Sequence, residues 1–182
     1  MLQIAVPLTQ EGWDEEKQEF VEPKFQMLQL EHSLVSISKW ESKWCKAFLS
    51  KSEMTYEETL DYIKCMTLTK NVDPEVYNHI TMSNIEEIKR YIAAPMTATY
   101  FSESKENNRP SREVVTSELI YYWMITLDIP VKFETWHLNR LLTLVQVCNV
   151  KNQPAKKMSK SDLASRNRAL NAARRQQLNS KG

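Results

Sequence analysis

Three histidines are the side chains of this 182-residue chain best suited to acid–base or metal chemistry near neutral pH. None of them lies in the H-E-x-x-H pattern of a zinc protease. Glu134 and His137 have the Glu-x-x-His spacing of di-metal helix bundles, but such a site needs a second copy of the motif, and the sequence contains none. We therefore predict structural roles for His32, His79 and His137, and no metal site.

The three cysteines indicate a reducing compartment. Cys45, Cys65 and Cys148 are odd in number and widely spaced, which is not the pattern of a disulfide framework. A cysteine and a histidine that meet in the fold could form a nucleophile pair, because such partners meet in space rather than in sequence. This alternative stays open, although the residues give no positive sign of it.

Two pairs of neighbouring carboxylates, Glu57 with Glu58 and Glu86 with Glu87, imitate the paired acids of a hydrolase. Each pair is expected in the first turn of a helix, where the helix dipole favours negative charge, and this explanation suffices. With only two glycines, the chain has no glycine-rich phosphate loop and no dinucleotide-binding fingerprint. The sequence therefore predicts no catalytic residues, no cofactor and no enzyme.

The charge of the chain is divided between an acidic body and a basic tail. Residues 1–150 carry 15 Lys and Arg against 22 Asp and Glu, a balance of −7, whereas residues 151–182 carry nine against one, a balance of +8. The tail is expected to bind an acidic partner, which could be the body of a neighbouring copy. The sequence shows neither a bilayer-spanning apolar segment nor a signal peptide, so we expect a cytoplasmic protein without a membrane partner.

The elements that must position these residues begin with a β-rich region over residues 1–41. Met1–Pro7 is a short strand candidate, and the acidic residues 10–23 are predicted to form a loop. The run 24–40 contains two groups of apolar residues with a polar connection between them, which favours a β-hairpin. A short helix is predicted from Ser42 to Phe48.

Three helices with recognisable starts are predicted next. Thr55 and Glu58 form a capping-box pair at the start of a helix that runs to about residue 69. Pro74 favours the first helical position and begins a short helix that ends near residue 80. Ser83 and Glu86 repeat the capping-box spacing, and an apolar stripe follows them.

Residues 111–150 contain the most apolar part of the chain. After an exposed loop over residues 96–110, Ser111 is predicted to cap a helix whose segment 119–127 is apolar except for Thr126. A helix that is apolar all round must be covered by other elements, so the helix after Pro130 is expected to pack back on it. The residues predicted to form the core of this helical hairpin are Tyr122, Trp123, Trp136, Leu141, Leu142 and Val145.

The tail is predicted to consist of a linker over residues 151–158 and a basic helix or arm over residues 159–182. Ser159 resembles a helix cap, and the residues after it are good helix formers to about residue 179. A stripe of one large apolar residue per two turns cannot hold a helix firmly on a body, so the helix projects or becomes ordered on a partner. The residues predicted to bind this partner are Arg166, Arg168, Leu170, Arg174 and Arg175.

The predicted fold is therefore α+β and mainly α. An N-terminal β-hairpin or small sheet packs on a helical body with a central apolar helical hairpin, and a basic helix follows at the C-terminus. Residues 1–150 form a single globular domain, with β-structure in residues 1–41 and helices in residues 42–150.

Nucleic acid is a second class of partner for the tail. Its arginines are sufficient to bind phosphates in a way that depends on salt concentration and not on base sequence. Tyr121, Tyr122 and Trp123 could also stack on bases if they were exposed. No recognition helix or RNA-binding signature accompanies them, and core packing explains the aromatic residues better. We favour a protein partner.

Several stretches of the sequence resemble a group of small proteins encoded by tailed bacteriophages. They are LEHSLVSISKWESKW (30–44), DPEVY and EEIKRYIAAPMTATYF (within 73–101), SELIYYWMITLDIPVKFETWHLNRLLTLVQVCNVKN (117–152) and the ending SRNRALNAARRQQLNSKG. WHLNRLL and LNAARR are the most specific pieces. The group is associated with the tail gene module, as tail assembly chaperones that act near the tape-measure protein.

The resemblance implies a non-enzymatic protein of the infected host's cytoplasm. Such a protein would coat the long helical tape-measure protein, keep it soluble, and help tail-tube subunits to polymerise around it. Its partners would be phage structural proteins, with a homo-oligomer as a further option. Two alternatives stay open: a virion component, such as a connector, tail-completion or head-lining protein, and a nucleic-acid-binding regulator.

Overall fold

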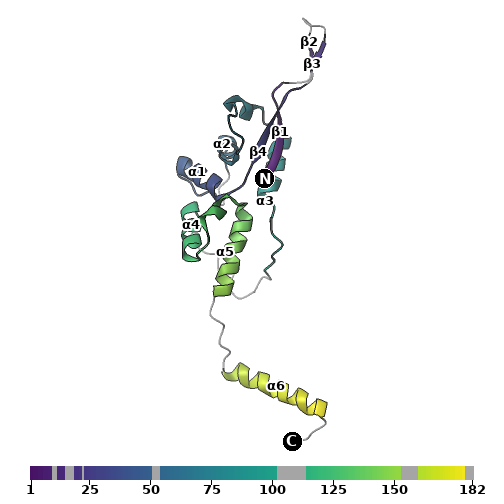
Figure 1. The fold of residues 1–182 in the computed structure, drawn as a ribbon, viewed down its shortest axis with the longest axis vertical. Coiled ribbons are helices and arrows are strands. Elements are labelled where there is room, and N and C mark those ends of the chain that lie inside the picture. Colours follow the sequence, from purple (N-terminus) through teal and green to yellow (C-terminus); the bar gives the residue numbers. More distant parts are fainter. Residues whose placement is uncertain are drawn as a thin grey trace. The chain divides into compact units, whose positions relative to one another are not determined.

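The structure is a computed structural model that describes residues 1–9, 12–14, 19–21, 23–50, 54–101, 114–152 and 160–178. The chain is mainly helical and carries a small two-stranded antiparallel sheet at its N-terminus, so the predicted fold class is confirmed (Figure 1). It divides into two compact units, Met1–Cys148 and Asn149–Gly182.

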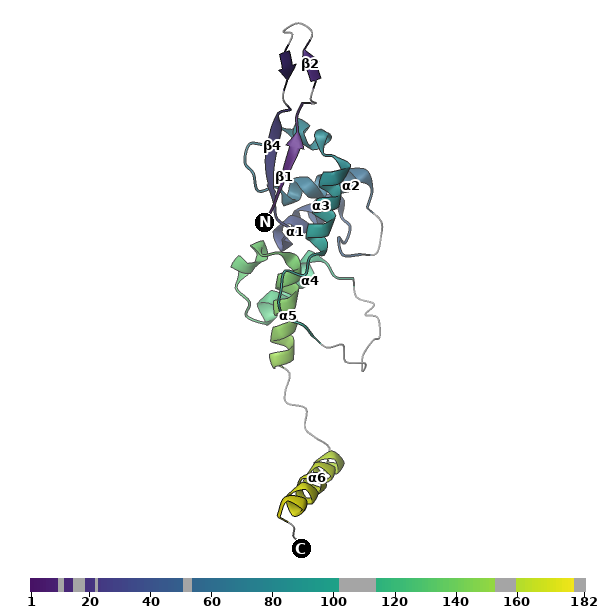
Figure 2. The same cartoon turned by 90° about the vertical axis from the view of Figure 1, so that its right-hand side faces the viewer.

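The N-terminal sheet consists of β1 (Leu2–Pro7) and β4 (Phe25–Leu30), which pair antiparallel along their whole length. The predicted first strand is confirmed. Successive side chains of a strand point to opposite faces, and the buried residues Ile4, Val6 and Leu28 face the core. Helix α3 (Met82–Ala93) contacts β1 and lies beside the sheet (Figure 2).

A second, shorter sheet interrupts the loop that the sequence predicts over residues 10–23. Strands β2 (Gly12–Asp14) and β3 (Glu19–Val21) pair antiparallel, with the backbone of Trp13 opposite Phe20. The loop prediction is wrong for these residues because it rested on the acidic side chains and ignored the β propensity of the aromatic ones.

The second half of the predicted hairpin is a helix, α1 (Leu34–Trp44), so that prediction is wrong. Ser33 caps the helix, and its hydroxyl oxygen accepts a hydrogen bond from the amide of Ser36 at 3.3 Å. The apolar residues Leu34, Ile37 and Trp40 recur at helical spacing and are all buried. Helical structure therefore begins at residue 34 instead of residue 42, and the predicted short helix from Ser42 is the last turn of α1.

Helix α2 (Tyr56–Met66) has the predicted capping box, in which Thr55 and Glu58 bond each other's backbone amides. It packs against α1, and the indole N–H of Trp40 donates to the Glu58 carbonyl at 3.0 Å. Lys43 of α1 forms an ion pair with Asp61, and Lys46, two residues after α1, forms one with Glu58. The next helix, η1 (Pro74–His79), is a 3-10 helix that begins at the predicted proline.

The cap of α3 differs from the predicted one. Thr81 is the N-cap, and its hydroxyl accepts from the amide of Asn84 at 3.2 Å while the Asn84 side chain reaches back to the Thr81 amide. Ser83 therefore lies inside the first turn. Glu86 and Glu87 lie in the second turn, so the predicted helix-dipole explanation for this pair is wrong.

The apolar region over residues 111–150 forms α4 (Ser117–Thr126), the 3-10 helix η2 (Val131–Thr135) and α5 (Leu138–Asn152). Ser111 lies outside the described residues, and α4 is capped by Thr116. Helix α5 ends at Asn152 and therefore includes the first two residues of the predicted linker.

The sequence predicts that helix α4 is covered on all sides, and this prediction is wrong. Its buried residues Ser117, Ile120 and Met124 occupy one face, and α4 packs against α1 (Figure 1). On the opposite face Tyr122 is 61% exposed and Ile125 is 70% exposed. Tyr122 is therefore a surface residue and does not belong to the core.

The core residues of the first unit form one continuous cluster, to which the β1–β4 sheet and helices α1 to α5 all contribute. Of the other residues predicted to form the core of the helical hairpin, Leu141 and Val145 are buried, whereas Trp123, Trp136 and Leu142 are half-buried. In the part of the chain that the structure describes, no helix is both long enough and apolar enough to cross a membrane.

The second unit contains α6 (Lys160–Leu178), which ends close to the predicted position. Every residue of α6 from 161 to 178 is exposed, including the large apolar residues Leu163, Leu170 and Leu178. Ser159 and most of the predicted linker lie outside the described residues.

Candidate functional site

Two buried histidines lie at the centre of the first unit. His32 follows β4, and His137 lies between η2 and α5; their ring centroids are 5.1 Å apart in an edge-to-face arrangement. Backbone pairing fixes this approach, because Ser33 forms a β-bridge with His137 and the Leu138 amide donates to the His32 carbonyl at 2.7 Å. The fold thus brings together two of the three histidines, whereas His79 is exposed in η1.

The hydrogen bonds of His137 indicate which ring nitrogen carries the proton. Its Nε2 lies 3.1 Å from the carbonyl oxygen of Tyr91, which can only accept. Its Nδ1 lies 3.3 Å from the amide nitrogen of Asn139, which can only donate. We therefore assign His137 as the neutral Nε2–H tautomer.

His32 is also held neutral. Its Nδ1 lies 2.5 Å from the hydroxyl oxygen of Tyr62. Burial, with a smaller contribution from the neighbouring His137, lowers the pKa of His32 to about 3. Burial also lowers the pKa of His137. At neutral pH both rings are uncharged, which suits packing better than general acid–base work.

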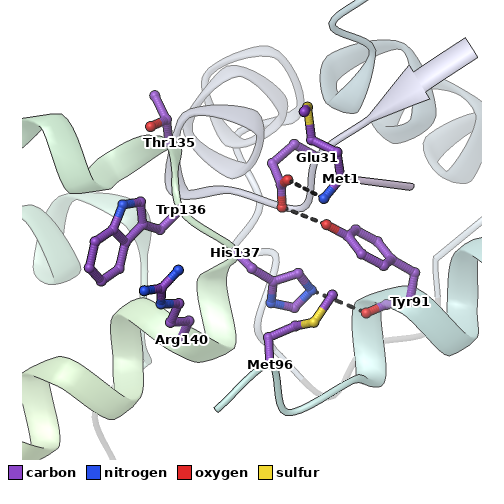
Figure 3. Close-up of a pocket in the computed structure, with 8 residues that line it drawn as sticks. All are labelled: Met1, Glu31, Tyr91, Met96, Thr135, Trp136, His137 and Arg140. Carbon is purple, nitrogen blue, oxygen red and sulfur yellow. Dashed lines mark hydrogen bonds and ion pairs between the residues drawn. The ribbon is translucent and has the colours of Figure 1, made fainter. Parts of the chain in front are cut away.

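A pocket of about 280 Å³ opens beside His137 (Figure 3). The Glu31 carboxylate accepts a hydrogen bond from the Tyr91 hydroxyl at 2.7 Å and pairs with the amino group of Met1 at 3.1 Å. The guanidinium of Arg140 lies 4.0 Å from the centre of the Trp136 ring. Glu31, Tyr91 and His137 thus bond to partners within the protein, and the exposed Arg140 lies at the pocket against Trp136.

The described residues offer little for metal or thiol chemistry. They include no group of three or more His, Cys, Asp or Glu side chains that could hold a metal ion. Cys45, Cys65 and Cys148 are free thiols. Burial raises the pKa of the Cys65 thiol, which is the opposite of the shift that activates a nucleophilic cysteine.

The residues predicted to bind a partner all lie on α6, and all are exposed. Helical spacing places Arg166, Leu170 and Arg174, four residues apart, along one face. Arg168 and Arg175 are seven residues apart and lie together on the opposite face.

Sequence reasoning missed two features of the first unit. One is the pocket, because Glu31 lies in the polar connection of the hairpin expected over residues 24–40 and no local pattern indicates its contact with Tyr91. The other is an exposed surface on and after α4, which we call the α4 surface. It consists of Glu118, Tyr122, Ile125, Asp128 and Val131.

Comparison of the chain with protein-family models, with curated proteins and with solved structures found no match.

Proposed function

We propose that this chain is a non-enzymatic phage morphogenesis protein, a tail assembly chaperone that binds the tape-measure protein and assists tail-tube polymerisation in the host cytoplasm. The observation that carries the proposal is the exposure of α6. This helix presents Leu163, Leu170 and Leu178 to solvent together with its arginines. Apolar side chains on a basic helix are typical of an element that becomes covered when a partner binds.

The chemistry of the first unit supports a binding role over a catalytic one. The buried histidines are neutral at pH 7 because burial lowers the pKa of each ring. Glu31 is engaged by Tyr91 and by the Met1 amino group, so it is not poised to take a proton from a substrate. The resemblance to the phage group adds the identity of the partner, a long helical protein that must be kept soluble.

The α4 surface supplies a second contact for such a partner. Tyr122 and Ile125 are exposed on one helix face, and an amphipathic helix binds by laying its apolar side on a surface of this kind. A body with an apolar helix face and an arm with exposed leucines can together hold an extended helical protein at two points.

Co-expression with an affinity-tagged tape-measure protein tests the proposal. The full chain should copurify with the tagged protein, and a chain that ends at Asn152 should not. A matched control keeps residues 160–178 in scrambled order, which preserves the charge and composition of α6 but breaks its Leu163–Leu170 face. Equal capture of all three chains would show that α6 does not carry the interaction.

Quantitative mass spectrometry of purified particles beside the infected-cell lysate separates a chaperone from a virion component. Abundance in the lysate with absence from particles is expected for an assembly factor that leaves. Several copies per particle would instead favour the connector or tail-completion alternative.

A further inference from the structure

The α4 surface has an acidic residue at each end of an apolar pair. Glu118, Tyr122 and Ile125 follow the i, i+4, i+7 spacing of one helix face, and Asp128 is exposed just after the helix ends. The inner face of the same helix is buried against α1. Val131 extends the apolar surface and is 58% exposed.

Helix α6 has the complementary pattern. Arg166, Leu170 and Arg174 lie on one face in the order base, apolar residue, base. Leu163, seven residues before Leu170, extends the apolar part of this face. The two arginines are separated by about 12 Å along the helix axis, and Glu118 and Ile125 are separated by about 10 Å along α4.

We propose that α6 of one copy of this chain docks on the α4 surface of a second copy. Leu163 and Leu170 would cover Tyr122 and Ile125, with the two arginines beside the two acids. The whole-chain charges favour the same pairing, since residues 1–150 carry a balance of −7 and residues 151–182 a balance of +8. The charged residues of η2, Lys132 and Glu134, offset each other.

Each copy carries both halves of this interface, one α6 and one α4 surface. The contact joins two different surfaces, so it either closes in a reciprocal dimer, in which each α6 docks on the other copy, or links copies head to tail into a ring or an open filament. The inference extends the proposed function, because self-association occupies the same α6 that we assign to the tape-measure protein. The two partners should compete, so the helix stays covered until the tape-measure protein is present.

Sedimentation equilibrium of the purified full chain, with no other phage protein present, tests the inference. The average mass should rise above 21.4 kDa with concentration, in the micromolar range typical of small interfaces (roughly 10–100 μM). R166E/R174E should weaken association more than tenfold, and E118K/D128K should do the same. The chain with all four substitutions has the wild-type net charge and should associate again.

The matched control is K156E/K157E, which changes the net charge by the same amount at positions before α6 and should leave association intact. Tryptophan fluorescence checks that the first unit of each variant is folded, and far-ultraviolet circular dichroism checks that α6 keeps its helical signal. A wild-type chain that is a monomer at every concentration overturns the inference. The inference is also overturned if the control variant loses association to the same extent and the fourfold variant does not recover it. Because the experiment contains no tape-measure protein, its failure leaves the proposed function to the capture experiment.

Discussion

His32 and His137, which come from distant parts of the sequence, lie edge to face with their ring centroids 5.1 Å apart in the core of the first unit. Both rings are neutral at pH 7, and a proton on one would raise the cost of a proton on the other. The pair lies where α5 meets the segment between β4 and α1, since the Leu138 amide donates to the His32 carbonyl at 2.7 Å. Protonation of either ring should therefore weaken the contact between these parts of the fold.

The first prediction is a loss of stability in mild acid. The folded-state pKa of His32 is about 3, below its unfolded value of 6.5, so the unfolded chain binds more protons between these values. The contribution of His32 is complete above pH 6.5 and is lost as the pH falls toward 3. The free energy of unfolding should decrease by about 2 kcal/mol between pH 7.5 and pH 5 from His32 alone, with His137 acting in the same direction.

Urea unfolding at a series of pH values above 4.5 measures this effect, because the ion-paired acids Glu58 and Asp61 contribute mainly below that range. His32→Gln should flatten the pH dependence, while His79→Gln, at an exposed position of η1, should leave it unchanged. A stability that is the same at pH 7.5 and pH 5 would contradict the prediction.

The second prediction concerns Glu41, a buried carboxylate at the end of α1. It accepts hydrogen bonds from the amides of Phe48 at 2.8 Å and Ser117 at 2.7 Å, and so ties the start of α4 to α1. Glu41→Ala leaves one buried and one partly buried amide without an acceptor and should destabilise the protein by roughly 2 kcal/mol. Glu41→Gln keeps one oxygen and should cost less. Glu57→Ala, at an exposed position in the first turn of α2, is the control and should change stability by less than about 0.5 kcal/mol; an equal loss in both would contradict the assignment.

The third prediction tests which residue caps α3. The hydroxyl of Thr81 satisfies the amide of Asn84, whereas Ser83 is exposed inside the first turn. Thr81→Ala should lower the free energy of unfolding by about 1 kcal/mol, and Ser83→Ala should have a much smaller effect. If chemical denaturation showed a larger loss for Ser83→Ala than for Thr81→Ala, the result would support Ser83, the cap that the sequence predicts.

The difference between Thr81 and Ser83 illustrates what the sequence can predict. Thr81 and Ser83 both have a side chain that can cap a helix. Asn84 stands three residues after Thr81 and Glu86 three residues after Ser83, so the choice depends on where the chain enters the helix. The buried Asn84 side chain also donates to the Ala5 carbonyl of β1 at 3.2 Å. That long-range bond is invisible to local pattern analysis.

Helix α1 shows a signal that was present and misread. Val35 and Ile37 suggest a strand by their β-branched side chains, yet the buried residues Leu34, Ile37 and Trp40 are spaced as on a helix. The true partner of β4 is β1, more than ten residues earlier in the chain, and no local rule pairs the two.

The candidate sites were less predictable than the fold. The contact between His32 and His137 depends on tertiary packing, as does the bond from Tyr91 to Glu31. The exposed face of α4 was missed because an apolar run suggests burial on every side, whereas α1 covers only one side of this helix. The arginines of α6 are exposed, because a helix with so few apolar side chains has little with which to pack. That they bind a partner stays a prediction.

The last prediction separates the stability of the first unit from that of α6. All five tryptophans lie before residue 150, so their fluorescence reports on the first unit alone. A chain that ends at Asn152 should unfold with the same free energy as the full chain, within about 0.5 kcal/mol, because every residue of α6 from 161 to 178 is exposed. Far-ultraviolet circular dichroism should show only the helical signal of α6 disappearing.

Both chains should be compared at low micromolar concentration, where self-association does not add to the stability of the full chain. A clear loss of stability on truncation would mean that α6 packs on the body of its own chain, and would argue against an arm that is held ready for a partner.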